Sequence, residues 1–343
     1  MVTNRRIRNG NYSDEEQNNK RFDYLYDYAF PVKKSLDDNK ILGGNNHATN
    51  RNQFLKKGKK GFEVALFSEL KRLQSIGIST PKVGIYIHGF NNDYQESIDE
   101  LFDLEKELTL VNSYPPLLIG FSWPSSGNVA YYLSDREEAR DSVGAFTRFL
   151  LDINNLAINN EQDCFSTSYC IAHSMGNYLL RKGMEYLSDT LGSPTGRKLF
   201  DETILIAPDL SSKDIELDGK GSYIADFSRR VHVYYSKHDR ALKASSIKRF
   251  GGKRLGRQGA INYQNLKDNI VVIDAEKYAN KVAVKGKIDR QGEQISVHNS
   301  HRYQKNILED IIQVISSIDR EQICGREVVE NEQPQQNNHY RLL

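Results

Sequence analysis

The chain has 343 residues and nearly balanced charge, 47 lysines and arginines against 45 aspartates and glutamates, which gives no support for a general nucleic-acid binder. Its three cysteines, Cys164, Cys170 and Cys324, show no C-x-x-C spacing, so we expect no disulfide framework and a reducing compartment. Neither a signal segment in the first 20 residues nor an apolar run of roughly 20 residues is present, so we expect a soluble, cytoplasmic protein without stable membrane insertion.

The composition divides the chain into three parts. Residues 1–60 are a polar N-terminal extension that we expect to be partly ordered, with an aromatic stretch at 22–30 that can pack as an added edge element and loop-like sequence at 36–60. Residues 61–320 form the main domain. Residues 321–343 form a polar C-terminal tail, because they hold too few apolar side chains to offset the entropy of ordering.

Short apolar runs alternate with amphipathic stretches through the main domain. In chain order, the pattern predicts a helix at 62–73, a strand at 83–87, a helix at 95–108, a strand at 117–121, a helix at 135–153, a strand at 169–172, a helix to 187, strands at 203–207, 231–235 and 270–273, and a last helix at 303–318. This order predicts an α/β fold with a doubly wound, mostly parallel sheet and helices on both faces. Ligands of such folds bind outside the carboxyl ends of the strands.

The turns after the first two strands of this sheet carry candidate binding groups. His88 and Gly89 follow the strand at 83–87, and Gly89 permits a tight turn that leaves the N–H of Phe90 free to hold an oxyanion. An ordinary strand-to-helix turn is the alternative. Trp123, the only tryptophan, follows the strand at 117–121, and we expect it to line a pocket or, preferably, to pack beneath it.

Ser174 lies between the strand at 169–172 and the next helix, in the run Ala172-His-Ser-Met-Gly176. This is the G-x-S-x-G pattern with alanine for the first glycine, and it is typical of a sharp turn that exposes a nucleophilic serine. The N–H of Met175, at the start of the helix, is then the second candidate oxyanion donor. The alternative is that Ser174 only caps the helix.

Two acids and two histidines follow at later strand ends. Asp209 comes after the strand at 203–207 and Asp239 after the strand at 231–235, while His298 and His301 precede the last helix. The order nucleophile, acid, histidine favours Asp239, with Asp209 as the alternative acid or a brace of the pocket. We prefer His301 as the base because it lies nearer the helix start, with His298 as the alternative.

Several of these segments together resemble a known family. The runs that begin at His88, Phe121, Ala172, Ala207, Ser236 and His301, with Arg254-Leu-Gly256, are similar to the alpha/beta-hydrolase family named "domain of unknown function 900" over about residues 80–318. The resemblance implies an alpha/beta-hydrolase fold for the domain at 61–320. It also implies Ser174 as nucleophile, Asp239 as acid and His301 as base.

These residues predict a serine hydrolase that cleaves a small-molecule or lipid ester, or a thioester, through an acyl-enzyme. We expect no cofactor and no metal, because the histidines lack H-E-x-x-H or comparable spacing. One alternative is a non-catalytic binding or scaffold protein that keeps the fold. Another is a phosphate or lipid-headgroup binder that uses the basic residues Lys248, Arg249, Lys253, Arg254 and Arg257. The sequence leaves the oligomeric state open.

Overall fold

The structure is a computed structural model of the chain. It describes residues 1–8, 11–16, 25–26, 62–112, 116–126, 128–159, 166–194, 196, 198–248, 252–289, 292–329 and 338–343. The expected loop at 36–60, Cys164 and Arg249 lie outside the described residues.

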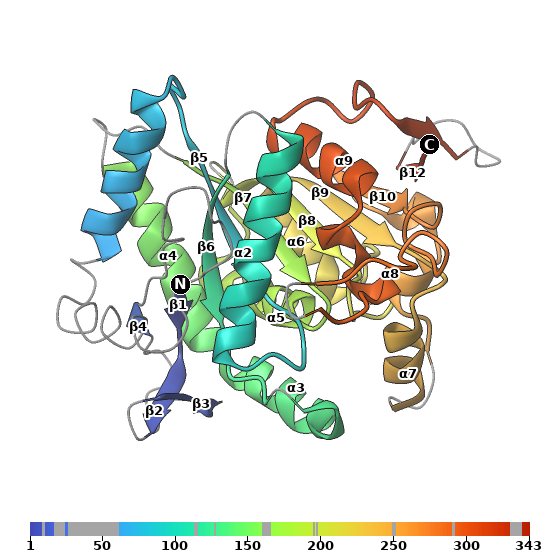
Figure 1. Cartoon of the computed structure of the whole chain (residues 1–343), viewed down its shortest axis with the longest axis horizontal. Coiled ribbons are helices and arrows are strands. Elements are labelled where there is room, and N and C mark those ends of the chain that lie inside the picture. Colours follow the sequence, from blue (N-terminus) through green and yellow to red (C-terminus); the bar gives the residue numbers. More distant parts are fainter. Residues whose placement is uncertain are drawn as a thin grey trace.

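One ten-stranded sheet forms the centre of the described molecule (Figure 1). Its strands, in spatial order, are β11 (Arg326–Val328), β12 (His339–Leu342), β10 (Ile270–Asp274), β9 (Ser228–Tyr235), β8 (Phe200–Ile206), β7 (Ser166–His173), β5 (Lys82–Ile87), β6 (Leu117–Ser122), β1 (Val2–Thr3) and β4 (Leu25–Tyr26). Every neighbouring pair from β12 to β1 is parallel, and the two outermost strands, β11 and β4, are antiparallel. The mostly parallel sheet predicted from the sequence is therefore confirmed. A separate hairpin joins β2 (Arg5–Arg8) to β3 (Asn11–Glu16).

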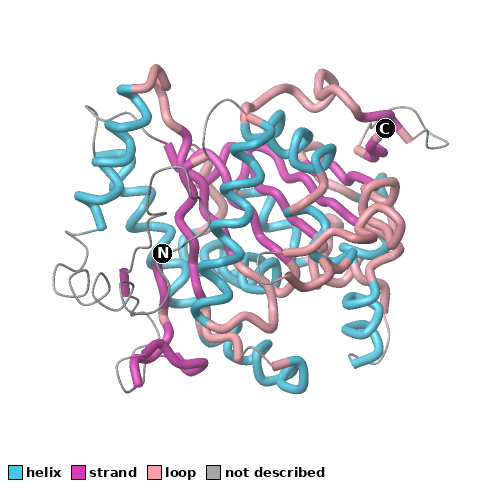
Figure 2. The backbone as a smooth tube through the Cα atoms, viewed as in Figure 1, coloured by secondary structure: helices cyan, strands magenta, loops and turns pink. Residues whose placement is uncertain are grey.

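Helices cover both faces of this sheet, as Figure 2 shows with strands in magenta between helices in cyan. The helices are a segment at 62–75, α2 (Tyr94–Val111), α3 (Tyr132–Asp141), α4 (Val143–Asn159), α5 (Gly176–Leu191), α6 (Tyr223–Asp226), α7 (Arg240–Lys248), α8 (Leu255–Gln258) and α9 (Lys305–Ile315). Short 3-10 turns are η1 (Val129–Tyr131), η3 (Lys220–Ser222), η4 (Tyr263–Asn265) and η5 (Val297–Arg302). α2 and α9 lie on one face of the sheet, and α4 and α5 lie on the other.

Alternating side chains of each strand fill two apolar layers, one on either face. On β5, Ile85 and Ile87 pack into the layer under α4 and α5, while Tyr86 points into the layer under α2 and α9. All three are fully buried. Burial on both faces explains why these strands are continuous apolar runs, and why their positions were readable from the sequence.

The helix expected at 135–153 is two helices instead. α3 and α4 meet at Ser142, whose hydroxyl donates a 2.7 Å hydrogen bond to the Glu138 carbonyl and accepts one from the Asn4 side chain. A serine hydroxyl that bonds back to the carbonyl four residues earlier bends a helix. The apolar spacing on either side of the break gave no sign of it.

The N-terminal extension enters the sheet instead of remaining outside the domain. β1 pairs with β6, and β4 pairs with β1 as an edge strand within the aromatic stretch. Arg5 is buried, and its guanidinium donates to Ser122 Oγ, the Ser125 carbonyl and the Asn92 carbonyl at 2.8–2.9 Å. Because burial is its largest influence, the pKa of Arg5 falls to about 10.

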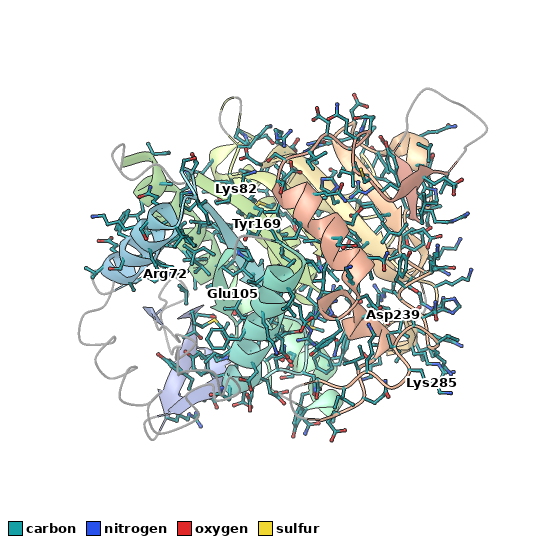
Figure 3. All side chains as sticks on the ribbon, turned by 45° about the horizontal axis from the view of Figure 1, so that its top comes forward. Arg72, Lys82, Glu105, Tyr169, Asp239 and Lys285 are labelled. Atoms are coloured by element: carbon teal, nitrogen blue, oxygen red, sulfur yellow. The ribbon has the colours of Figure 1, made fainter. Side chains whose placement is uncertain are left out.

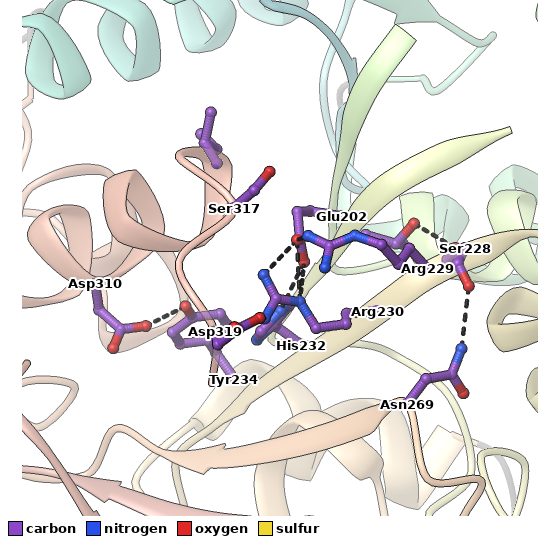
Figure 4. Close-up of polar contacts among 12 residues, drawn as sticks. Glu202, Ser228, Arg229, Arg230, His232, Tyr234, Asn269, Asp310, Ser317 and Asp319 are labelled. Carbon is purple, nitrogen blue, oxygen red and sulfur yellow. Dashed lines mark hydrogen bonds and ion pairs between the residues drawn. The ribbon is translucent and has the colours of Figure 1, made fainter. Parts of the chain in front are cut away.

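The segment expected to be a polar tail also completes the sheet. β12 lies between β10 and β11, with Tyr340 and Leu342 buried. Arg326 of β11 contacts Asp310 of α9 at 2.6 Å. Asp310 also accepts a hydrogen bond from the hydroxyl of Tyr234 (Figure 4). The boundary expected at residue 321 therefore does not separate a tail from the domain.

A second cluster of buried polar side chains lies at the amino ends of β8 and β9, on the same face of the sheet as Arg326 and Asp310. Glu202 is fully buried and accepts hydrogen bonds from Arg229, Arg230 and His232, as the close-up in Figure 4 shows. These contacts lie at the opposite end of the strands from Ser174 and Asp239, so they serve the fold.

Candidate active site

Ser174 occupies a sharp turn between β7 and α5. Its φ of 52° lies in the left-handed region, which an L-residue adopts only when the surrounding structure holds it there. The Ser174 N–H donates to the Ile206 carbonyl at 3.0 Å, and its carbonyl accepts from the Asp209 N–H at 3.1 Å. The main chain of the neighbouring strand β8 thus fixes the conformation of the turn.

Close approach of the backbone explains the small residues around this turn. A Cβ on Gly176 would lie 2.5 Å from the His88 carbonyl oxygen and 2.6 Å from that of Ile87. A Cβ on Gly89 would lie 3.1 Å from Ser174 Cβ, so the turn after β5 packs directly against the serine. The position of the first glycine in the pattern is held by Ala172, which is fully buried.

His88 and Trp123 hold the turn that carries Phe90. The Trp123 N–H donates to His88 Nε2 at 3.1 Å, the Trp123 indole donates to the His88 carbonyl at 3.0 Å, and the two rings stack at 5.2 Å. His88 Nδ1 lies 2.8 Å from the Gly89 carbonyl, so the proton of the neutral ring sits on Nδ1. Burial lowers the pKa of His88 to about 3, which keeps the ring neutral. Trp123 is fully buried and has the packing role that we preferred.

Of the two expected oxyanion donors, Met175 directly follows Ser174 in the chain, and Phe90 follows Gly89, which packs against the serine. Within the described residues, neither the Phe90 N–H nor the Met175 N–H donates to another protein group. Met175 directly precedes α5, so its N–H belongs to the positive end of a 16-residue helix. Both groups keep the hydrogen-bonding capacity that an oxyanion site requires.

Asp239 pairs with His298. His298 Nδ1 lies 2.6 Å from Asp239 Oδ2, and the other carboxylate oxygen accepts the Leu242 N–H at 2.9 Å. Asp239 lies in the loop after β9, on the carboxyl side of the sheet (Figure 3). Because Nδ1 donates to the carboxylate, Nε2 is the nitrogen of His298 that remains available to accept a proton.

The preference for His301 as the partner of Asp239 is corrected by this geometry. His301 is 3% exposed, and neither of its ring nitrogens has a hydrogen-bond partner among the described residues. Both histidines lie in η5, where residues three apart eclipse one another. Both rings therefore lie on one side of this turn, 4.8 Å and 4.5 Å from the ring of His173, but only His298 contacts Asp239. The sequence indicated two candidate histidines before the last helix, and the preference for His301 rested only on its position nearer the helix start.

Burial and mutual attraction together set the pKa values of Asp239 and His298. Burial raises the pKa of the Asp239 carboxyl, but the nearby His298 outweighs burial and holds it below its usual value. Burial lowers the pKa of His298, and Asp239 more than reverses that effect, so the pKa lies above the ordinary 6.5. In contrast, burial and His173 hold the pKa of His301 well below that value.

A buried carboxylate on α2, which no sequence motif indicated, anchors the loop that carries His298. Glu100 Oε1 lies 2.8 Å from Arg302 Nη1 and 3.2 Å from His173 Nδ1. His173 Nε2 in turn lies 3.2 Å from the His298 carbonyl oxygen. Burial raises the pKa of Glu100, but Arg302 and His173 outweigh it and hold the pKa far below its usual range. No motif marked Glu100, because it lies in a helix with many charged residues.

Asp209 braces the site and does not contact either histidine of η5. Its carboxylate accepts hydrogen bonds from the Tyr132 hydroxyl and the Ser245 hydroxyl, each at 2.7 Å. Arg254 Nε lies 3.5 Å from the same carboxylate. Asp209 therefore joins α3 and α7 to the turn that holds Ser174, which is consistent with the bracing role considered for it.

No group of three or more histidines, cysteines, aspartates or glutamates with metal-binding geometry occurs within the described ranges. None of the helices described there is long and apolar enough to cross a membrane.

A mostly parallel sheet covered by helices, with a serine on a strained turn after a central strand, defines the alpha/beta-hydrolase class. The chain belongs to the family described as "Alpha/beta hydrolase of unknown function (DUF900)", whose family model matches residues 67–287. The family indicated by the sequence motifs is thereby confirmed.

Two known proteins show more distant likenesses. The uncharacterised protein alr1448 of Nostoc sp. is 28% identical in an alignment 263 residues long that covers 66% of this chain and 65% of that protein. The chain thus spans slightly less than two thirds of that relative. A solved structure of the phospholipase PlaB from Legionella pneumophila in complex with thio-NAD matches 65% of this chain and 41% of its own, with 15% identity and a TM-score of 0.25.

Proposed function

We propose that the protein is a serine hydrolase that cleaves ester-type substrates through an acyl-enzyme, with Ser174 as nucleophile, His298 as base and Asp239 as acid. The observation that carries the proposal is the 2.6 Å contact between Asp239 and His298 at the edge of the sheet where Ser174 occupies its strained turn. A pair of this kind orients an imidazole and stabilises its protonated form.

The reaction begins when His298 Nε2 takes the proton of Ser174 Oγ as that oxygen attacks the ester carbonyl. The N–H groups of Phe90 and Met175 stabilise the negative charge that develops on the carbonyl oxygen. His298 then gives its proton to the leaving alcohol, and the acyl group stays on Ser174. Water enters, loses a proton to His298 and releases the acid product by the same route.

Asp239 keeps the proton of neutral His298 on Nδ1, so Nε2 presents its lone pair to the serine. Its negative charge also favours the imidazolium that forms during each half-reaction. His301, with a lowered pKa and no contact with an acid, has neither property.

The test compares the unmodified protein with Ser174→Ala, using p-nitrophenyl acetate turnover and covalent labelling by a fluorophosphonate. Both signals are expected to disappear in the variant, while the thermal midpoint stays nearly unchanged because alanine keeps the backbone conformation. Full labelling and turnover in Ser174→Ala would contradict the proposal. No labelling of the unmodified protein would favour the alternative of a non-catalytic binding protein.

A further inference from the structure

A cavity of about 690 Å³ lies next to Asp239, beyond the carboxyl ends of β9 and β10. The residues of its wall that carry the argument are Tyr235, Lys237, His238, Lys253, Arg257 and Glu276. None of the residues assigned above to the hydrolytic reaction lines it. It is therefore a separate site that adjoins the candidate active site.

The charges around this cavity are predominantly positive. Its one carboxylate, Glu276, is already ion-paired with Lys237. Within the described ranges, no carboxylate lies at ion-pair distance from Lys253 or Arg257. Two cations thus remain uncompensated, with His238 beside them, in a chain whose overall net charge is only +2.

Arg257 is held in place at the boundary between the cavity and the candidate active site. Its Nε donates a 3.2 Å hydrogen bond to the main-chain carbonyl of Asp239, and the residue is partly buried. Arg254, three residues earlier, is buried and turned toward Asp209 instead. The two arginines therefore differ, since only Arg257 lines the cavity, and its guanidinium has no carboxylate at ion-pair distance among the described residues.

We propose that this cavity binds a phosphate group through Lys253 and Arg257. Arginine binds phosphate oxygens through two parallel N–H donors, and lysine adds a point charge, so together they suit a tetrahedral dianion better than a single carboxylate. The volume exceeds that of a phosphate, and the Tyr235 ring supplies an apolar wall for the group attached to it. The phosphate belongs either to an ester substrate or to free inorganic phosphate. The first source rests on the proposed hydrolase function.

The binding test titrates inorganic phosphate into the full-length protein by calorimetry, at constant ionic strength adjusted with sodium chloride. Lys253→Gln is expected to weaken binding about tenfold, in line with the loss of one charge-assisted hydrogen bond. Lys253 is exposed, so this variant is expected to fold normally. The matched control is Lys243→Gln, an exposed lysine on α7 that does not line the cavity. Equal phosphate affinity in both variants, or no binding to the unmodified protein, would overturn the proposal.

The source of the phosphate is decided with a pair of substrates, a monoacylglycerol and the same compound with a phosphate on the glycerol. If the substrate carries the phosphate, Lys253→Gln lowers kcat/KM about tenfold for the phosphorylated ester alone. If the site takes free phosphate, calorimetric binding still weakens while both esters are hydrolysed as before. Failure of the hydrolase proposal appears separately, as phosphate binding without turnover of either ester.

Discussion

At the scale of single residues, the backbone around Ser174 is packed so closely that Gly176 has no room for a side chain. The 2.5 Å separation between a Cβ at position 176 and the His88 carbonyl oxygen is below any normal contact. The same carbonyl also accepts the Trp123 indole N–H. The turn of Ser174 and the turn of Phe90 are thus fitted to each other through His88.

The two histidines of η5 are expected to differ in their effect on catalysis. Replacing His298 with alanine removes the proposed base, so kcat/KM for p-nitrophenyl acetate is expected to fall by about 10³-fold or more. His301→Ala removes a buried ring without hydrogen bonds, and we expect lower stability with kcat/KM within about tenfold of the unmodified protein. The measurement is steady-state kinetics on both variants at one pH. A larger loss in His301→Ala than in His298→Ala would reverse the assignment.

The pH dependence of activity is expected to follow the protonation of His298. Its pKa lies above 6.5, and only the neutral ring accepts a proton, so kcat/KM is expected to rise with pH through a midpoint above 6.5. Asp239→Asn removes the charge that raises this pKa, so the midpoint moves to lower pH while the maximal rate falls by about 10⁴-fold. Profiles of kcat/KM from pH 5 to 9 for both proteins check this. An unmoved midpoint in Asp239→Asn would contradict it.

The pKa shifts of His298 and Asp239 make the free energy of unfolding depend on pH in opposite directions. For His298 the folded-state pKa is raised, so its contribution is present below the unfolded pKa and is lost as the pH rises through the folded value. For Asp239 the folded-state pKa is lowered, so its contribution is lost as the pH falls through that value. The pair is therefore most stabilising at mildly acidic pH, between these two transitions.

At the scale of elements, η5 is held against α2 by the buried pair of Glu100 and Arg302. The replacement Glu100→Gln leaves Arg302 without its buried counter-charge, which is expected to cost about 3–5 kcal/mol of unfolding free energy. Because η5 carries His298, kcat is expected to fall more than KM changes. Urea unfolding and steady-state kinetics measure the two effects.

The matched control for this change is Glu309→Gln on α9, which removes an exposed partner of Lys305. Exposed ion pairs contribute at most about 1 kcal/mol, so this variant is expected to be close to the unmodified protein in both measurements. Equal behaviour of the two variants would show that the buried pair does not position η5.

The residues of the candidate site could be predicted from the sequence only where each follows directly after a strand that is recognisable by itself. Ser174 and Asp239 follow strands whose apolar runs are distinct, so their positions could be counted. The choice between His298 and His301 depended on which of two eclipsed positions in one short turn lies beside Asp239, which no periodicity reports. Glu100 was missed because its partner Arg302 is some 200 residues away along the chain.

At the scale of the whole molecule, the two polar ends of the chain help to complete the sheet. The strands of the main domain were predicted correctly because burial on both faces gives them long apolar runs. β12 has only two buried apolar side chains, Tyr340 and Leu342, and its pairing with β10 becomes visible only once the domain has folded. Because β12 has only four residues, its apolar side chains hardly change the polar composition of the segment around it, and composition alone does not predict the strand.

The C-terminal strands are expected to be essential for stability because Arg326 pairs with Asp310 inside the domain. Arg326→Met leaves a buried carboxylate unpaired, which is expected to cost about 3–5 kcal/mol in chemical unfolding. Arg341→Met in β12 is the control, since Arg341 is largely exposed and contacts Asp274 only at 3.8 Å. A double replacement, Arg326→Met with Asp310→Leu, is expected to recover only part of the loss, because the buried Tyr234 hydroxyl then lacks its acceptor. A single Arg326→Met variant as stable as its control would contradict this role.

Under the proposed hydrolysis, the left-handed backbone at Ser174 opposes selection for stability to selection for turnover. Glycine adopts that conformation without steric penalty, whereas serine requires its neighbours to enforce it. A lineage or a laboratory screen that rewarded only heat resistance would therefore drift toward glycine at this position and lose the hydroxyl. Serine at this position is thus the residue that the proposed hydrolysis requires, at some cost in stability.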